Sequence, residues 1–78
     1  MIKAYIKLHN IDDIIELQKV ANECTYELIL RGKCDYNPKS LLNMFTVPTN
    51  KVLTLFAKTD DRRDFSDKFS RFLNVYDT

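Results

Sequence analysis

The sequence predicts an α+β fold with the element order β-α-β-β-α-β-α: a two-layer, open-faced sandwich of a four-stranded antiparallel sheet with three helices on one face. Segments with apolar residues at every second position alternate with segments whose apolar residues recur at three- and four-residue spacing, as in half-buried strands and amphipathic helices. The two middle strands are joined by a turn too short for a parallel crossover. The sheet is therefore antiparallel, and the helices need cover only one of its faces.

The first strand is predicted by apolar residues at alternate positions: Ile2, Ala4, Ile6 and Leu8. The polar segment that follows, residues 9–13, caps a helix whose apolar stripe consists of Ile14, Leu17, Ala21 and Cys24. Acidic residues in its first turn, Asp12, Asp13 and Glu16, favour the positive end of the helix dipole.

A hairpin is predicted around Gly32, the only glycine, which we expect to adopt a positive φ between strands at residues 26–31 and 34–36. Asn37 should then cap a short helix, with Pro38 at its first position. The apolar residues of that helix, Leu41, Leu42, Met44 and Phe45, lie on more than one face, so part of this surface should face outward, toward a partner.

The last strand is expected over residues 51–58, and Thr59-Asp60-Asp61 should cap a closing helix. Its aromatic stripe, Phe65, Phe69, Phe72 and Tyr76 with Leu73 beside it, has helical spacing and is interpreted as core, with three stacked phenyl rings.

The length of 78 residues predicts one domain, residues 1–78. The 12 Lys and Arg nearly balance the 11 Asp and Glu, which argues against general nucleic-acid binding and leaves open only a local basic patch. We therefore expect no nucleic-acid partner. No signal peptide or membrane-spanning run is visible, so we expect a cytoplasmic protein without a membrane partner. Cys24 and Cys34 are expected to be reduced, and no cofactor or metal is indicated.

The middle of the chain resembles the HPr family, the histidine-containing phosphocarriers of the bacterial sugar phosphotransferase system. The resemblance is carried by Gly32-Lys33, a short strand, Lys39-Ser40-Leu41-Leu42 and the short apolar helix, and the element order extends it over essentially the whole chain. It implies the HPr fold, a role that is not enzymatic and Ser40 as the target of a regulatory kinase. It also implies protein partners, from the phosphotransferase system or transcription regulation.

The phosphohistidine motif of that family, Leu-His-x-Arg-Pro, is degenerate in this chain. Aligned on Leu8-His9, it has Ile11 at the arginine position and Asp12 at the proline position. Aligned from the following helix, Asn10 takes the histidine position and Asp12 the arginine position. In both alignments the arginine is lost and carboxylates are present, so we expect no catalytic residue and no phosphoryl transfer.

The function predicted from these residues is a regulatory, protein-binding module without a competent phosphohistidine. Its candidate partner-binding residues are Ile11, Leu41, Leu42 and Phe45. Each site residue also has a plainer interpretation: a loop residue for His9, helix caps for Asp12, Asp13 and Ser40, and core packing for some of the apolar residues. The alternatives are an atypical phosphocarrier that uses His9 with Lys7 or Arg31, and reuse of the scaffold for an unrelated binding role. The catabolite-repression HPr homologue resembles this chain in lacking the histidine while keeping the Lys-Ser-Leu element.

Overall fold

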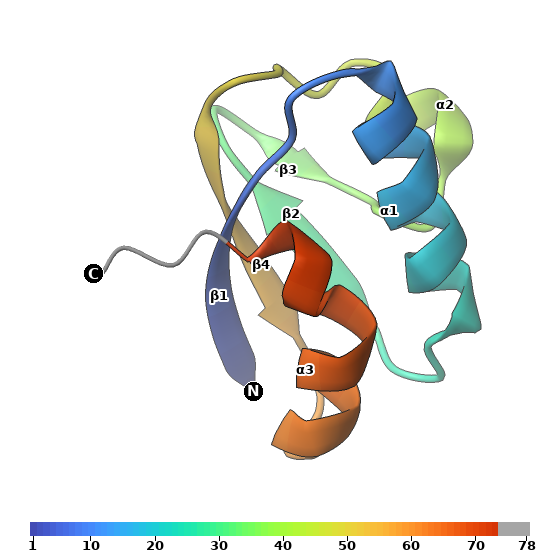
Figure 1. Cartoon of the computed structure of the whole chain (residues 1–78), viewed down its shortest axis with the longest axis vertical. Coiled ribbons are helices and arrows are strands. Elements are labelled where there is room, and N and C mark those ends of the chain that lie inside the picture. The colour runs from blue at the N-terminus through green and yellow to red at the C-terminus, as the bar shows by residue number, and fades with distance from the viewer. Residues whose placement is uncertain (74–78) are drawn as a thin grey trace.

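The structure, a computed structural model, describes residues 1–73. Its strands are β1 (Ile2–Lys7), β2 (Leu28–Arg31), β3 (Asp35–Tyr36) and β4 (Val52–Ala57). Its helices are α1 (Ile11–Glu23), α2 (Leu41–Met44) and α3 (Arg62–Phe69), followed by the 3₁₀ turn η1 (Ser70–Phe72). Figure 1 shows the helices together on one side of the sheet. The predicted fold class and element order are confirmed.

All strand pairs in the sheet are antiparallel, and the strand order is β1-β4-β2-β3. β4, late in the chain, is thus paired on both sides. Ala4 faces Leu55 across the β1–β4 pair, and Leu30 faces Leu55 across the β2–β4 pair. Because side chains alternate between faces along a strand, one face is apolar and buried under the helices, and the other carries polar and aromatic residues.

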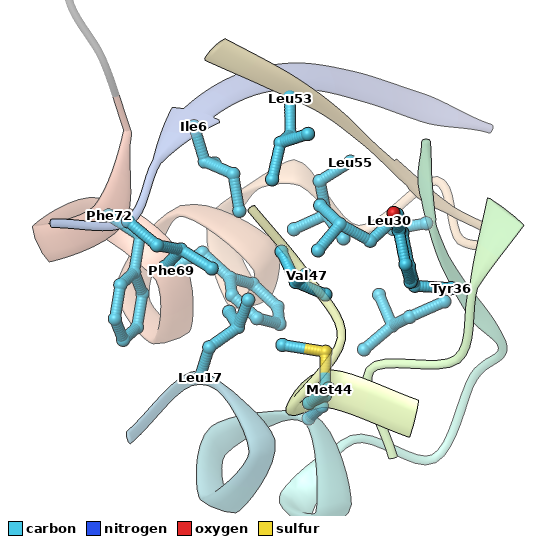
Figure 2. Close-up of a cluster of buried hydrophobic side chains, with 14 of the residues drawn as sticks. Ile6, Leu17, Leu30, Tyr36, Met44, Val47, Leu53, Leu55, Phe69 and Phe72 are labelled. Carbon is cyan, nitrogen blue, oxygen red and sulfur yellow. The ribbon is translucent and has the colours of Figure 1, made fainter. Parts of the chain in front are cut away.

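The core forms between that apolar face and the helices (Figure 2). Side chains of the sheet, among them Ile6, Leu30 and Leu55, point toward Leu17 of α1 and Phe69 of α3, and all of these are fully buried. The stripe predicted on α1 is also confirmed: Ile14, Leu17, Ala21 and Cys24 are all buried.

The closing helix is shorter than predicted. α3 ends at Phe69 and η1 follows, after which Leu73 forms an antiparallel bridge with Ile6 of β1. Phe65, Phe69 and Phe72 are buried, as expected, but Tyr76 lies outside the described residues. The expected stack of three phenyl rings is wrong: within residues 1–73 one tilted pair is found, Phe65 and Phe69, whose centroids are 4.9 Å apart with the planes at 37°.

The hairpin needs its glycine for space, and the expected positive φ at Gly32 is wrong. Among the described residues, the positive φ belongs to Asn50, at 60°, in the loop before β4. A Cβ at Gly32 would come within 2.7 Å of Leu53 Cδ2, inside any normal contact. A side chain at this position would therefore require the buried Leu53 side chain on β4 to shift.

The prediction of Asn37 as the cap of α2 is also wrong, whereas the plainer interpretation of Ser40 as a helix cap is confirmed. Its N-cap is Ser40, whose hydroxyl accepts a hydrogen bond from the Asn43 backbone N–H at 3.3 Å. Asn37 and Pro38 belong to a turn before the helix, in which the Asn37 carbonyl accepts from the Ser40 N–H at 3.0 Å. A proline permits a helix start, but the hydroxyl at the correct distance from Asn43 decides where the helix begins.

A polar cluster joins the segment before β2 to α3. The Tyr26 hydroxyl donates to Asp64 at 3.0 Å, and Lys68 Nζ lies 2.6 Å from the same carboxylate. The lysine ammonium, and then the tyrosine, hold the pKa of Asp64 below its usual value. Of the two cysteines, both free as expected, Cys24 is buried and Cys34 is exposed.

Candidate functional site

The junction between β1 and α1 holds the candidate phosphohistidine positions, His9 and Asn10, and both are exposed. Asn10 is the N-cap of α1: its side-chain oxygen accepts from the Asp13 N–H at 3.0 Å. Asp13 in turn accepts from the His9 backbone N–H at 3.0 Å. The cap is thus Asn10 rather than Asp12 or Asp13, and Asp13 places a carboxylate in the first turn, where the dipole favours negative charge.

His9 lines an open hollow of about 330 Å³ together with Lys7, Asp13 and residues of η1. One of these is Arg71, whose guanidinium lies 3.4 Å from the Glu16 carboxylate. Two basic residues thus line the same hollow as His9: Lys7, which the sequence suggested, and Arg71, which it did not. The only sequence signal that could have identified Arg71 is its position between two aromatic residues of the predicted core, Phe69 and Phe72.

Arg31, the other cation considered for His9, belongs to a different part of the molecule. Its Nε donates to Asp35 at 2.7 Å, and its guanidinium carbon lies 5.0 Å from the Phe56 ring centroid. Because β4 separates β2 from β1 in the sheet, Arg31 is not at the β1–α1 junction. The prediction that Arg31 could serve as a charge partner for His9 is therefore wrong.

The second candidate site is the surface formed by α1 and α2. Gln18 and Asn22 of α1 both donate to the Lys39 carbonyl before α2, at 3.3 Å. After α2, the Asn50 N–H donates to the carbonyl of Leu8, just before α1, at 2.6 Å. The segment from Lys39 to Asn50, which contains α2, thus runs antiparallel to α1. Leu41 lies toward the end of α1, and Phe45 lies toward its beginning, where Ile11 stands.

This α1–α2 surface consists of Ile11, Leu41, Leu42 and Phe45, which are 55%, 40%, 81% and 46% exposed. Met44 alone among the apolar residues of α2 is buried, and it fixes which side of the short helix faces the core. The expectation that Leu42 or Phe45 is exposed is confirmed. The plainer interpretation, that two of Leu41, Leu42 and Phe45 pack inward, is wrong because all three are exposed.

Ser40 borders this surface and caps α2, as described above. It also lines an open hollow of about 470 Å³, together with Tyr36, Asn37 and Asn43. Lys39, expected to neutralise a phosphate on Ser40, instead donates through Nζ to the Cys24 carbonyl at the end of α1, at 3.2 Å. It would have to leave this carbonyl to reach a phosphate.

Comparison with known proteins identifies the architecture. No family model and no curated protein matches the chain. Among solved structures it is similar to the crystal structure of HPr-C-His from Thermoanaerobacter tengcongensis. The TM-score is 0.75 at 16% identity, over 92% of this chain and 91% of that one. The chain has the HPr-like fold.

At this identity the similarity to HPr is one of fold. Within the HPr-like fold, the described residues include no group of three His, Cys, Asp or Glu side chains placed to share a metal ion. No helix within residues 1–73 is both long and apolar enough to cross a membrane.

Proposed function

We propose that the chain is a protein-binding, regulatory module related to the bacterial phosphotransferase system, and that it contacts its partner through the α1–α2 surface. The observation that carries this proposal is the exposure of Ile11, Leu41, Leu42 and Phe45 on two touching helices. Large apolar side chains gathered on one face of a small protein mark interaction sites. Apolar and aromatic anchors supply most of the binding energy of interfaces.

The chemistry of the β1–α1 junction supports binding without phosphoryl transfer. Ile11 provides no cation, and the Asp13 carboxylate already accepts the His9 backbone N–H. At about 5 Å from a phosphate dianion, each carboxylate costs on the order of several kcal/mol at intermediate dielectric. At the helix N-terminus that could hold a phosphate, the Asp13 N–H already donates to Asn10, and Asp12 and Asp13 place negative charge in the first turn.

Phosphorylation of Ser40 would regulate this surface. A phosphate adds a charge of about −1.5 to −2, directly beside the exposed Leu41. It would also replace the hydroxyl that caps the first turn of α2. Both effects oppose docking of an apolar partner, so the phosphorylated form is the weaker binder.

Substitutions on the surface test the proposal with purified phosphotransferase-system proteins and their transcription regulators as candidate partners. The double variant Leu42→Ser/Phe45→Ser should lose binding while unfolding at nearly the wild-type denaturant concentration, since exposed side chains contribute little to stability. Val52→Ser is the matched control, because Val52 is 47% exposed on the other face of the sheet. Ser40→Glu should weaken binding more than Ser40→Gln, which separates charge from size. A stability loss of several kcal/mol in the double variant would show that these residues belong to the core and would contradict the proposal.

One observation favours a second candidate function, an atypical phosphocarrier: Lys7, His9 and Arg71 line the same hollow. Incubation with phosphoenolpyruvate and the first enzyme of the phosphotransferase system, followed by intact-mass measurement, distinguishes the two functions. Our main proposal expects no acid-labile adduct. An added phosphoryl group that disappears in His9→Ala would establish the carrier instead, and Arg71→Ala would then reduce its yield.

A further inference from the structure

The face of the sheet opposite the helices is not covered by any element within residues 1–73 (Figure 1). Its side chains are the alternate residues of the strands that do not enter the core: Lys3, Tyr5 and Lys7 of β1, Ile29 and Arg31 of β2, Asp35 of β3, and Val52, Thr54 and Phe56 of β4. The α1–α2 surface lies on the other side of the sheet, so a ligand on this face would be separate from the partner proposed above.

Two aromatic rings lie on this face. Tyr5 is 46% exposed and Phe56 is half-buried. Tyr5 is opposite Thr54, and Lys3 is opposite Phe56, in the β1–β4 register. Tyr5 and Phe56 are therefore diagonal neighbours on adjacent strands, about 7–8 Å apart at the backbone, and form a short platform of two rings.

Cations accompany both rings. Lys3 Nζ lies 5.6 Å from the Tyr5 ring centroid, and the Arg31 guanidinium carbon lies 5.0 Å from that of Phe56. At the end of the sheet where Lys7 pairs with Val52, Lys33 and Lys51 line one hollow with Val52. The core residues Tyr36 and Leu53 line it too, so these two lysines lie at the rim of the face. Basic side chains thus extend from the rings to the hairpin end of the sheet.

The acidic residues of this face are already neutralised. Asp35 pairs with Arg31 at 2.7 Å, and Glu27 pairs with Lys58 at 3.2 Å. Within residues 1–73, no ion pair joins a carboxylate to the remaining cations, Lys3, Lys7, Lys33 and Lys51. The near-balance of 12 basic and 11 acidic residues therefore conceals an uneven distribution. The expectation that the chain does not bind nucleic acid is based only on the total numbers of charged residues. It allows for a local basic patch, and the unpaired lysines of this face form such a patch.

We propose that this face binds single-stranded nucleic acid, with bases against Tyr5 and Phe56 and phosphates near the lysines. Single-strand binding surfaces combine aromatic stacking platforms with a basic track for the backbone, as this face does. In a duplex the bases are stacked on each other and cannot reach the rings. A second copy of the chain is a poor occupant, because two such faces would oppose their unpaired lysines.

Fluorescence anisotropy with a fluorescein-labelled 12-mer of uridine tests the proposal. Tyr5→Leu and Phe56→Leu keep an apolar side chain but remove the ring, so each should raise the Kd by about fivefold or more, while circular dichroism shows a folded protein. In Lys3→Ala/Lys7→Ala the slope of log Kd against log salt should fall by about 1.4, since each phosphate contact contributes about 0.7 for single strands. Leu42→Ser, on the other side of the molecule, should bind like wild type.

Competing ligands define the results that would overturn the proposal. A duplex of the same length and a polyglutamate should compete poorly with the 12-mer. Equal competition by polyglutamate, with no effect of either leucine variant, would show a general polyanion surface. Binding to phosphatidylglycerol vesicles but not to the 12-mer would assign the face to membranes, and no binding to any probe would leave the face without this role. Because Leu42→Ser/Phe45→Ser leaves this face intact, loss of partner binding and loss of nucleic-acid binding are separable.

Discussion

At the scale of single residues, two turns of the chain need a particular amino acid for two different reasons. Gly32 provides space beneath the hairpin, whereas Asn50 provides a left-handed backbone before β4. Asparagine tolerates that conformation better than most residues because its short polar side chain can hydrogen-bond locally. The sequence marks both positions as turns, but the reason for the glycine depends on Leu53 in another strand, which no local pattern reveals.

Gly32→Ala should destabilise the protein by about 1–3 kcal/mol, the usual range for overpacking. The cause is the approach of the new methyl group to Leu53 Cδ2, at 2.7 Å without rearrangement, and Leu53 is buried. Urea denaturation of the two single variants and of Gly32→Ala/Leu53→Val checks this. The pair should be coupled, the double variant losing less than the sum of the single losses. Additive losses would place the cost in the backbone instead.

At the scale of the secondary-structure elements, an element could be predicted from the sequence when the contacts that determine its ends are local in the chain. The strands and α1 follow from periodicity, because burial alone determines them, and the α1 cap is local. The start of α2 depends on which polar side chain accepts from a helix N–H: Ser40 accepts from Asn43, whereas Asn37 accepts from Lys39, before the helix. The end of α3 depends on Leu73 bridging to Ile6. The helical spacing of the aromatic residues continues to Tyr76 in the sequence. It contains no information on the bridge that Leu73 forms with a strand far away in the chain.

The ion pair of α3 predicts a dependence of stability on acid pH. Lys68 and Tyr26 lower the pKa of Asp64 from its ordinary value of 3.8. The unfolded chain therefore takes up the proton first as the pH falls, and the stabilisation present above about pH 4 is lost below it. The melting temperature of wild type should fall more steeply below pH 4 than that of Asp64→Asn. Asp67→Asn, an exposed change in the same helix, is the control and should follow wild type.

At the scale of the whole molecule, the candidate sites were only partly predictable. Individual residues such as His9, Ser40 and Leu42 could be identified by motif and by excess hydrophobicity. Their surroundings could not: the presence of Arg71 in the hollow of His9 and the position of Arg31 beyond β4 both follow from the topology. Net charge and motif spacing contain no information on which side of the sheet a residue lies.

The shared core depends on Phe69, whose side chain is fully buried between α3 and the sheet. Phe69→Ala should cost roughly 3–5 kcal/mol, the range for large-to-small changes of a buried aromatic residue. In a domain of this size that is a large share of the total stability. Chemical denaturation followed by circular dichroism measures it, with the exposed Ser66→Ala on the same helix as control. A Phe69→Ala variant as stable as wild type would mean that α3 is not packed on the sheet.

The position of β4 has a consequence for how the chain folds. β1 and the β2–β3 hairpin are both made before β4, yet neither pairs with the other, and β4 inserts between them. A growing chain that ends before Val52 therefore has an unpaired first strand and a hairpin with one open side. Most sheet hydrogen bonds form together when β4 arrives. Closure of these long loops must precede the gain from pairing, so folding should be slower than in a helical bundle of equal length. The sheet therefore cannot be completed until β4, the last strand to be synthesised, is available.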